Sequence, residues 1–407
     1  MKKTYIDTAM ERIAPDLILK GGNVVDVFSG RVIKADVIIK DGIICGVGSY
    51  SGENEQDVSG KYIMPGFIDS HVHIESSMTQ PSEYAKAVMP HGITTVIADP
   101  HEITNVCGED GLEFMLKSAK NIPLDVNLML PSCVPATPFE HTGANLDAKT
   151  TQKLAPKFFG IGEMMNYPGI VSGDDETLGK LCLDIIDGHA PLLSGHELDA
   201  YASVGIKTDH ECSVVEEMTE KISKGMYILL REGTLSLDVA KLIKGVTPYT
   251  LRRCAFCTDD RFVGEIIRDG SIDHCIRKAV SLGLSNIDAV IMATLNACEM
   301  YGMKNKGAIA PSYVADIVVA DDLNLSSISQ VYKNGKLVCE NGKALFECET
   351  VDNSKVTNTV HLPKISADFF KTDVKDKFDA IELIPESIIT KKVTVSYSDS
   401  LSKVCVI

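Results

Sequence analysis

Histidine and acidic residues recur at the ends of short apolar runs between residues 62 and 260. The set comprises His71, His73, Asp99, His101, Glu102, Glu163, His189, His210, Asp259 and Asp260. Side chains two positions apart on a strand point to the same side, so we expect His71 and His73 to face one way. Imidazole and carboxylate groups together are ligands for divalent metal ions. The pattern therefore predicts a metal cage, provided that the runs end at one place.

Such a cage indicates hydrolytic chemistry. A bound divalent ion lowers the pKa of a water ligand to about 7, so that hydroxide is available at neutral pH. Two ions bridged by that hydroxide and by a carboxylate would hold the nucleophile in position. A carboxylate edge that binds no metal can then take up the proton and return it to a leaving group.

The apolar runs themselves predict the element that would bring these residues together. Eight candidate strands alternate with helical stretches, at residues 62–71, 92–100, 125–133, 158–166, 183–190, 205–211, 226–233 and 253–260. Eight such units are the count of a (β/α)₈ TIM-like barrel, and continuous apolar runs are typical of parallel strands buried on both faces. The carboxyl ends of all barrel strands converge on one mouth. The α/β barrel fold would therefore assemble the cage.

Two β-rich flanks surround the barrel units. Residues 17–66 and 314–346 contain alternating apolar positions separated by Asp-Gly and Asn-Gly turns. We expect the two flanks to form one small β-sandwich domain around the barrel. The predicted divisions are 1–63 for the first part of the sandwich, 64–306 for the barrel, 307–346 for the return to the sandwich, and 347–407 for the start of a truncated C-terminal domain.

Composition limits the partners. A net charge of -16 disfavours nucleic acid, whose phosphates require a basic face, and is compatible with a neutral or cationic small molecule. The N-terminus lacks the apolar region of a signal peptide, and no run reaches eighteen apolar residues, so no membrane span is predicted. Twelve cysteines without a disulfide framework indicate reduced thiols and a cytoplasmic location.

Seven motifs in order carry a resemblance to a known family. MPGFIDSHVHIESS at 64–77 resembles the opening motif of the amidohydrolase superfamily. The next five resemble motifs of its adenine deaminases: ADPHEITNV at 98–106, GIGEMMNYPG at 160–169, DGHAP at 187–191, DHE at 209–211 and CTDDR at 257–261. GAIAPSYVADIVVADDL at 307–323 resembles the segment that re-enters the small β-sandwich after the barrel. The resemblance covers residues 17–345. A single HxH is unspecific, whereas the ordered set is specific.

The resemblance implies roles residue by residue. The metal ligands are His71, His73, Glu163, His189, His210 and Asp259, with Glu163 in place of the carbamylated lysine of many relatives. Asp259 is also implied as the proton shuttle. Strand alternation alone leaves Asp259 and Asp260 as alternatives; the motif favours Asp259 and leaves Asp260 to pair with Arg261 or cap a helix. Asp99, His101 and Glu102 are implied to bind the substrate or an additional metal.

The implied reaction is hydrolytic deamination of adenine to hypoxanthine and ammonia, a step of purine salvage. A binuclear centre of Mn²⁺ is expected, with Fe²⁺ or Zn²⁺ as alternatives, and His101 or Glu102 would assist Asp259 in catalysis. The protein is expected to be a homo-oligomer. Two other hypotheses stay open: an amidohydrolase for another cyclic amide, amidine or N-acyl substrate, and a truncated, inactive assembly subunit. Family members usually continue into a further domain, so activity of this chain alone does not follow.

Overall fold

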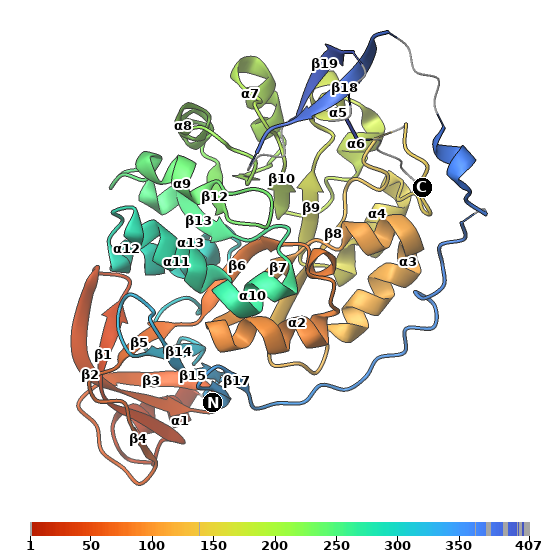
Figure 1. The fold of residues 1–407 in the computed structure, drawn as a ribbon. Coiled ribbons are helices and arrows are strands. Elements are labelled where there is room, and N and C mark those ends of the chain that lie inside the picture. Colours follow the sequence, from red (N-terminus) through yellow and green to blue (C-terminus); the bar gives the residue numbers. More distant parts are fainter. Residues whose placement is uncertain are drawn as a thin grey trace.

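The computed structural model describes residues 2–137, 139–362, 364–371, 376–385, 390–396, 398, 401 and 402. Helices surround a central set of strands, and a separate sheet lies at one side (Figure 1). The expected domain at 347–407 lies partly outside the described residues. The ranges that follow concern the described part of the chain.

Eight parallel strands form the centre. They are β6 (Phe67–Val72), β7 (Ile93–Ala98), β8 (Asp125–Leu130), β9 (Gly160–Met164), β10 (Ile186–Gly188), β11 (Thr208–Asp209), β12 (Tyr227–Arg231) and β13 (Cys254–Cys257). One sheet runs β10-β9-β8-β7-β6 and a second runs β11-β12-β13. A parallel bridge between Val72 and Asp259 joins the second sheet to the first, and the Gly188 N–H donates to Thr208 Oγ1 at 3.0 Å across the other seam. The strands therefore form a TIM-like barrel.

All eight predicted runs contain a barrel strand, but the first prediction was too simple. The run 62–71 holds two strands, because β5 (Tyr62–Pro65) belongs to the outer sheet and β6 to the barrel. Gly66 separates them, and a Cβ at this position would lie 2.3 Å from Thr94 Oγ1. Only glycine allows the chain to pass so close to β7 as it enters the barrel.

The crossovers are helical, as predicted. They contain α2 (Pro81–Val88), α3 (His101–Ser118), α4 (Ala148–Leu154), α5 (Tyr167–Ser172), α6 (Asp175–Gly179), α7 (Gly195–Ser203), α8 (Val215–Ser223), α9 (Val239–Leu242), α10 (Val263–Asp269), α11 (Ile272–Ser281), α12 (Asn286–Ala293) and α13 (Leu295–Met300). Helix α11 buries Ile272, Cys275, Ile276 and Ala279, a spacing that places one apolar stripe against the barrel. The short fourth crossover is divided into α5 and α6, and Asp174 caps α6 by accepting from the Thr177 N–H.

The two flanks meet in one nine-stranded sheet. Its strands are β1 (Leu17–Asp26), β2 (Arg31–Lys40), β3 (Ile43–Gly48), β4 (Glu55–Asp57), β5, β14 (Ile317–Ala320), β15 (Ile328–Lys333), β16 (Lys336–Glu340) and β17 (Lys343–Ala344). Antiparallel pairing of β5 with β14 joins the first flank to the second. The predicted Asn-Gly turns are present, because Asn334–Gly335 and Asn341–Gly342 have positive φ angles between β15, β16 and β17.

Three short segments lie outside these two units. Helix α1 (Lys2–Ala9) precedes the sheet, and the chain after β17 runs beside α3 before the hairpin β18 (Phe378–Leu383) and β19 (Thr390–Val395) (Figure 1). Lys355 pairs with Asp110 of α3 at 2.7 Å.

No helix among the described residues has the length and apolar character needed to cross a bilayer. The eleven cysteines in the described part of the chain are free thiols.

Candidate metal centre

The two histidines that end β6 point into the barrel mouth together. His71 and His73 are 0% and 2% exposed, and their Nε2 atoms are 3.1 Å apart. The Nδ1 atom of His73 lies 2.8 Å from the Asp99 carbonyl oxygen, so Nδ1 donates to that oxygen and Nε2 is the nitrogen that could bind a metal ion. The Nδ1 atom of His71 lies 3.6 Å from Asp187 Oδ2. Metal-ligating histidines are typically oriented in this way by a carbonyl or a carboxylate.

Glu163 connects these histidines to two others. Its Oε1 atom lies 3.3 Å from His73 Nε2, while Oε2 lies 2.6 Å from His189 Nδ1 and 3.2 Å from His210 Nε2. His189 follows β10 and His210 follows β11. One carboxylate therefore spans two groups of imidazoles, as a bridging ligand would.

The residue before Glu163 has a packing role. A Cβ at Gly162 would lie 2.1 Å from Asp99 Oδ2, and that same oxygen accepts the Glu163 N–H at 2.9 Å. Glycine at this position leaves room for the Asp99 carboxylate, which follows β7, to bind the backbone of β9 next to Glu163.

Asp259 completes the cage from the end of β13. Its Oδ1 atom lies 3.1 Å from His73 Nε2 and 3.6 Å from His71 Nε2. Its backbone has a φ of 56°, an uncommon conformation for a residue other than glycine, and its N–H donates to the His71 carbonyl at 3.0 Å. Asp260 is exposed, and it accepts from Ser76 Oγ rather than pairing with Arg261, whose Nη1 donates to the Glu232 carbonyl. The structure therefore directs Asp259 towards the histidines.

Asp99, His101 and Glu102, which follow β7, lie beside the cage. His101 Nδ1 is 3.2 Å from Glu163 Oε1, and Glu102 Oε2 is 3.5 Å from His73 Nδ1. Asp99 is 1% exposed and directs Oδ2 to the Glu163 backbone, so it reaches the cage only indirectly. All the residues singled out from the sequence thus lie at one end of the barrel, where Asp99 contacts the backbone of Glu163.

The charges of the cage balance one another when no cation is bound. Burial alone would raise the pKa of Glu163, but the imidazoles of His189, His101 and His210 hold it well below its ordinary value. Burial opposes the charge on His210, yet Glu163 and Asp259 raise its pKa to about 9. Protons therefore occupy positions that a cation would take, and metal binding must displace them.

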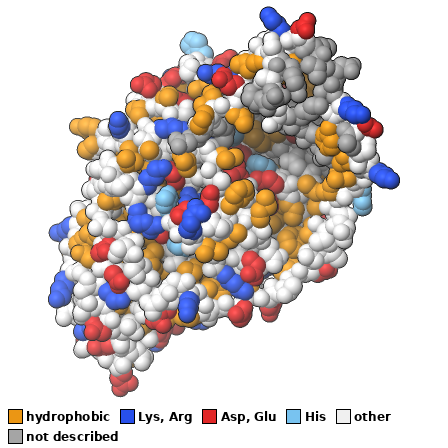
Figure 2. Space-filling model, viewed as in Figure 1, with side chains coloured by type: hydrophobic (Ala, Val, Ile, Leu, Met, Phe, Trp, Pro, Cys, Tyr) orange, Lys and Arg blue, Asp and Glu red, His pale blue; other side chains and the backbone are white. Residues whose placement is uncertain are grey.

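The donor set fits divalent metal ions. Three groups each place one ligand atom of every member within 4.8 Å of the others: His71–His73–Glu163, His71–His210–Asp259 and Glu163–His189–His210. A fourth such group is His73–His101–Glu102. Mixed imidazole and carboxylate donors suit first-row divalent metals. On the face shown in Figure 2, histidine and acidic side chains are visible inside a hollow bordered by hydrophobic side chains.

Comparisons with known proteins agree with this geometry. The model of the Amidohydrolase family matches residues 62–338. The chain is 46% identical over 402 residues to adenine deaminase 2 of Desulfotalea psychrophila, covering 97% of this chain and 70% of the relative. It is 47% identical over 397 residues to the adenine deaminase of Clostridium acetobutylicum, covering 95% and 70% respectively. The chain belongs to the adenine deaminase family of the amidohydrolase superfamily.

Solved structures of more distant members share the fold. The crystal structure of enamidase has a TM-score of 0.61 at 18% identity, over 82% of this chain and 97% of that one. The β-aspartyl dipeptidase of Fervidobacterium islandicum AW-1 has a TM-score of 0.58 at 19% identity, over 83% and 98%. Members of the superfamily are metal-dependent hydrolases, and this chain has clusters of histidine and acidic side chains at the barrel mouth that could hold a metal ion.

Two further residues at the site were not assigned from the sequence. Glu211 Oε1 lies 3.4 Å from His210 Nε2 and 3.7 Å from His189 Nδ1, and Arg231 donates to both Glu211 and Asp259. Glu211 was visible within the DHE motif. Arg231 could have been found from the sequence, because a charged residue at the end of the apolar run YILLR indicates a buried side chain that needs a partner.

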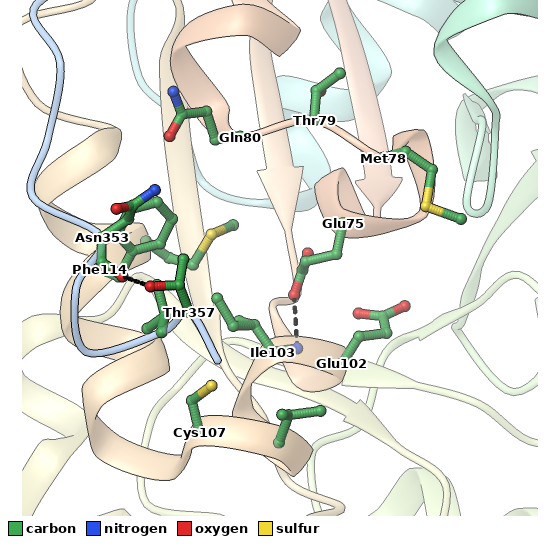
Figure 3. Close-up of a pocket in the computed structure, with 13 residues that line it drawn as sticks. Glu75, Met78, Thr79, Gln80, Glu102, Ile103, Cys107, Phe114, Asn353 and Thr357 are labelled. Carbon is green, nitrogen blue, oxygen red and sulfur yellow. Dashed lines mark hydrogen bonds between the residues drawn. The ribbon is translucent and has the colours of Figure 1, made fainter. Parts of the chain in front are cut away.

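A cavity of about 600 Å³ borders the cage on the side of Glu102. Figure 3 shows the carboxylates of Glu75 and Glu102 on one side of it and Phe114, Asn353 and Thr357 on the other. Within the part of the chain that the structure describes, the buried Oε2 atoms of Glu75 and Glu102 have no hydrogen-bond partner. The segment after β17 supplies part of the wall, so a piece of chain remote in sequence from the cage lines this open cavity.

Proposed function

We propose that this chain catalyses the hydrolysis of adenine to hypoxanthine and ammonia. The observation that carries the proposal is the meeting of His71, His73, Glu163, His189, His210 and Asp259 at the mouth of a barrel in a chain of the adenine deaminase family. These side chains come from five different strand ends. No requirement of packing would collect four imidazoles and two carboxylates there, since each buried charge costs free energy unless it is paired.

Two divalent ions would be held by this set. His71, His73 and Asp259 would hold one ion and His189 and His210 the other, with Glu163 between them. Manganese suits mixed imidazole and carboxylate ligands, as do iron and zinc. When bound, the ions supply a water whose pKa is lowered towards about 7 and which is therefore nucleophilic at neutral pH.

The protein side chains would move the protons. Asp259 would accept the proton of the water that attacks C6 of the purine and deliver it to the exocyclic nitrogen. The C6–N bond then breaks and ammonia leaves, while oxygen stays on the ring. Burial opposes the charge of His101, but Glu163 and Asp99 raise its pKa to about 9, so His101 would donate to the ring nitrogen. Glu102, which also lies beside the cage, would accept from an N–H of the purine.

The substrate would reach the cage through the cavity bordered by Glu102. Burial opposes the charge of Glu102, but the adjacent His73 and His101 lower its pKa to about 2, so the carboxylate is an acceptor at neutral pH. An amino group and ring N–H of a purine are suitable donors for such an acceptor. Apolar side chains in the wall, including Ile103 and Phe114, suit the ring faces.

The remaining proposals concern the organisation of the molecule. We divide the chain as above, at 1–63, 64–306, 307–346 and 347–407, with the nine-stranded sheet folded as a sandwich. Its support is a shared core in which Val37 of β2 and Ile317 of β14 pack in one cluster. We further propose that the protein is a cytoplasmic homo-oligomer. It would bind a purine base and no nucleic acid.

The test uses the 407-residue chain, stripped of metal and reloaded with Mn²⁺. Adenine, a cyclic amide and an N-acyl amine are offered separately, and hypoxanthine is followed by absorbance and ammonia by a coupled assay. The proposal expects equal amounts of hypoxanthine and ammonia from adenine alone. Turnover of either amide without release of ammonia from adenine would contradict it.

A further inference from the structure

Arg231 is a buried cation shared among three acids. It is the last residue of β12 and is 2% exposed. Its guanidinium donates to Glu211, to Asp259 and to Asp238. Glu211 follows β11 and Asp259 follows β13, so the arginine joins the acids at the ends of the two neighbouring strands.

The two oxygens of Asp259 have different partners. Oδ2 accepts from Arg231 Nη1 at 3.0 Å, whereas Oδ1 lies 3.1 Å from His73 Nε2 inside the cage. The same Nη1 atom also donates to Glu211 Oε1, the oxygen that faces His210 and His189. One nitrogen thereby fixes the position of two carboxylates relative to the histidines.

The plane of the guanidinium is itself held from the opposite side. Arg231 Nε donates to Asp238 Oδ2 at 3.1 Å, and Lys241 Nζ donates to the other oxygen of Asp238 at 2.9 Å. A planar fork held at two edges is more selective in direction than a single ammonium group. Without it, Asp259 Oδ2 would be a buried acceptor with no donor, and the carboxylate could rotate away from the cage.

We infer that Arg231 is a positioning residue that turns Oδ1 of Asp259 towards the metal cage and holds Glu211 beside His189 and His210. This inference rests on the proposed function only in that the cage binds divalent ions. It does not depend on the identity of the organic substrate.

The experiment measures Mn²⁺ affinity of the metal-free full chain by competition with a chelator. Arg231→Met should weaken affinity by about 10- to 100-fold, the range typical for residues that orient metal ligands. It should lower kcat for adenine while changing KM little, because Arg231 is buried and does not line the cavity proposed for the purine. Arg231→Lys keeps the charge and should recover part of the affinity. Arg277→Met is the matched control, since Arg277 pairs with Asp273 on α11 outside the cage.

A mutant cycle separates positioning from general damage. If Arg231 acts through Asp259 and Glu211, Arg231→Met should have little further effect on Mn²⁺ affinity in a background that carries both Asp259→Asn and Glu211→Gln. An unchanged affinity in folded Arg231→Met, or an equal loss in both backgrounds, would overturn the inference. If Arg231→Met does not fold, Arg231→Lys and Arg231→Gln replace it in the cycle. Wild-type chain that binds Mn²⁺ but leaves adenine intact would refute the proposed function and leave this measurement valid.

Discussion

At the scale of single residues, backbone conformation decides between two adjacent aspartates. Alternation along a regular strand predicts that either Asp259 or Asp260 faces inward, and it cannot choose between them. The chain leaves the strand geometry at Asp259, where φ is 56°, and the side chain then points to His73. Sequence motifs favoured the same residue. The role of Arg231 was not predicted, because its partners follow two other strands and are distant in sequence.

Asp259→Asn should therefore lower kcat for adenine by about 10²- to 10⁴-fold, the usual contribution of a positioned proton-transfer group. The amide keeps the size of the side chain but cannot accept and return a proton. Asp260→Asn is the control and should stay close to wild type, since Asp260 is exposed. Ammonia release at saturating adenine and Mn²⁺ checks both variants. Equal losses in the two variants would contradict the assignment.

A second prediction at this scale concerns Asp69 and the pH dependence of the free energy of unfolding. It is 0% exposed, accepts from the N–H and Oγ1 of Thr258, and burial raises its pKa from 3.8 to about 7. Between these values the folded chain keeps a proton that the unfolded chain has lost, so the free energy of unfolding falls as pH rises. The loss is about 1.4 kcal/mol per pH unit and at most ~4 kcal/mol in total.

Asp69→Asn removes this titration while preserving a donor and an acceptor for Thr258. In urea unfolding of the metal-free protein, the variant should be more stable than wild type at pH 8, and the difference should shrink at pH 5. A difference that is the same at both pH values would show that Asp69 is ionised in the folded state throughout.

At the scale of elements, the strands could be predicted from the sequence, whereas the contacts that join neighbouring strands could not. All eight barrel runs were predicted because apolar runs and crossovers alternate regularly. The division of the first run at Gly66 was missed, since nothing local distinguishes two strands that join different sheets. The seam between β10 and β11 was also not predictable. There Lys221 of α8 donates to Asp209, to Glu217 and to the Ala190 carbonyl at 2.9, 2.7 and 2.6 Å.

This buried cluster fixes the residues next to His189 and His210. Lys221→Met should lower the free energy of unfolding by about 3–5 kcal/mol, because two buried carboxylates lose their cation. Lys224→Met is the matched control, as Lys224 pairs with Asp199 at the surface and should contribute about 0–1 kcal/mol. Urea unfolding at pH 7 measures both. Similar small losses would mean that the cluster is not held by its charges.

At the scale of the whole molecule, the barrel and the outer sheet are joined by charged side chains. Lys333 of β15 donates to Asp316 at 2.7 Å and to Asp125 of β8 at 2.7 Å, and Lys306 contacts the same two acids. The sequence predicted that the two flanks belong together, because their turn and strand patterns match. It could not predict these contacts, which depend on how the sheet lies against the barrel.

The closed arrangement of strands is what brings ligands together from positions as distant as His71 and Asp259. Crystals of the full chain grown with Mn²⁺, measured at the manganese absorption edge, test this most directly. Anomalous density should appear between the imidazoles of His71, His73, His189 and His210, with Glu163 at its centre. Density bound by other residues, or none at this mouth while the six side chains point apart, would contradict the account.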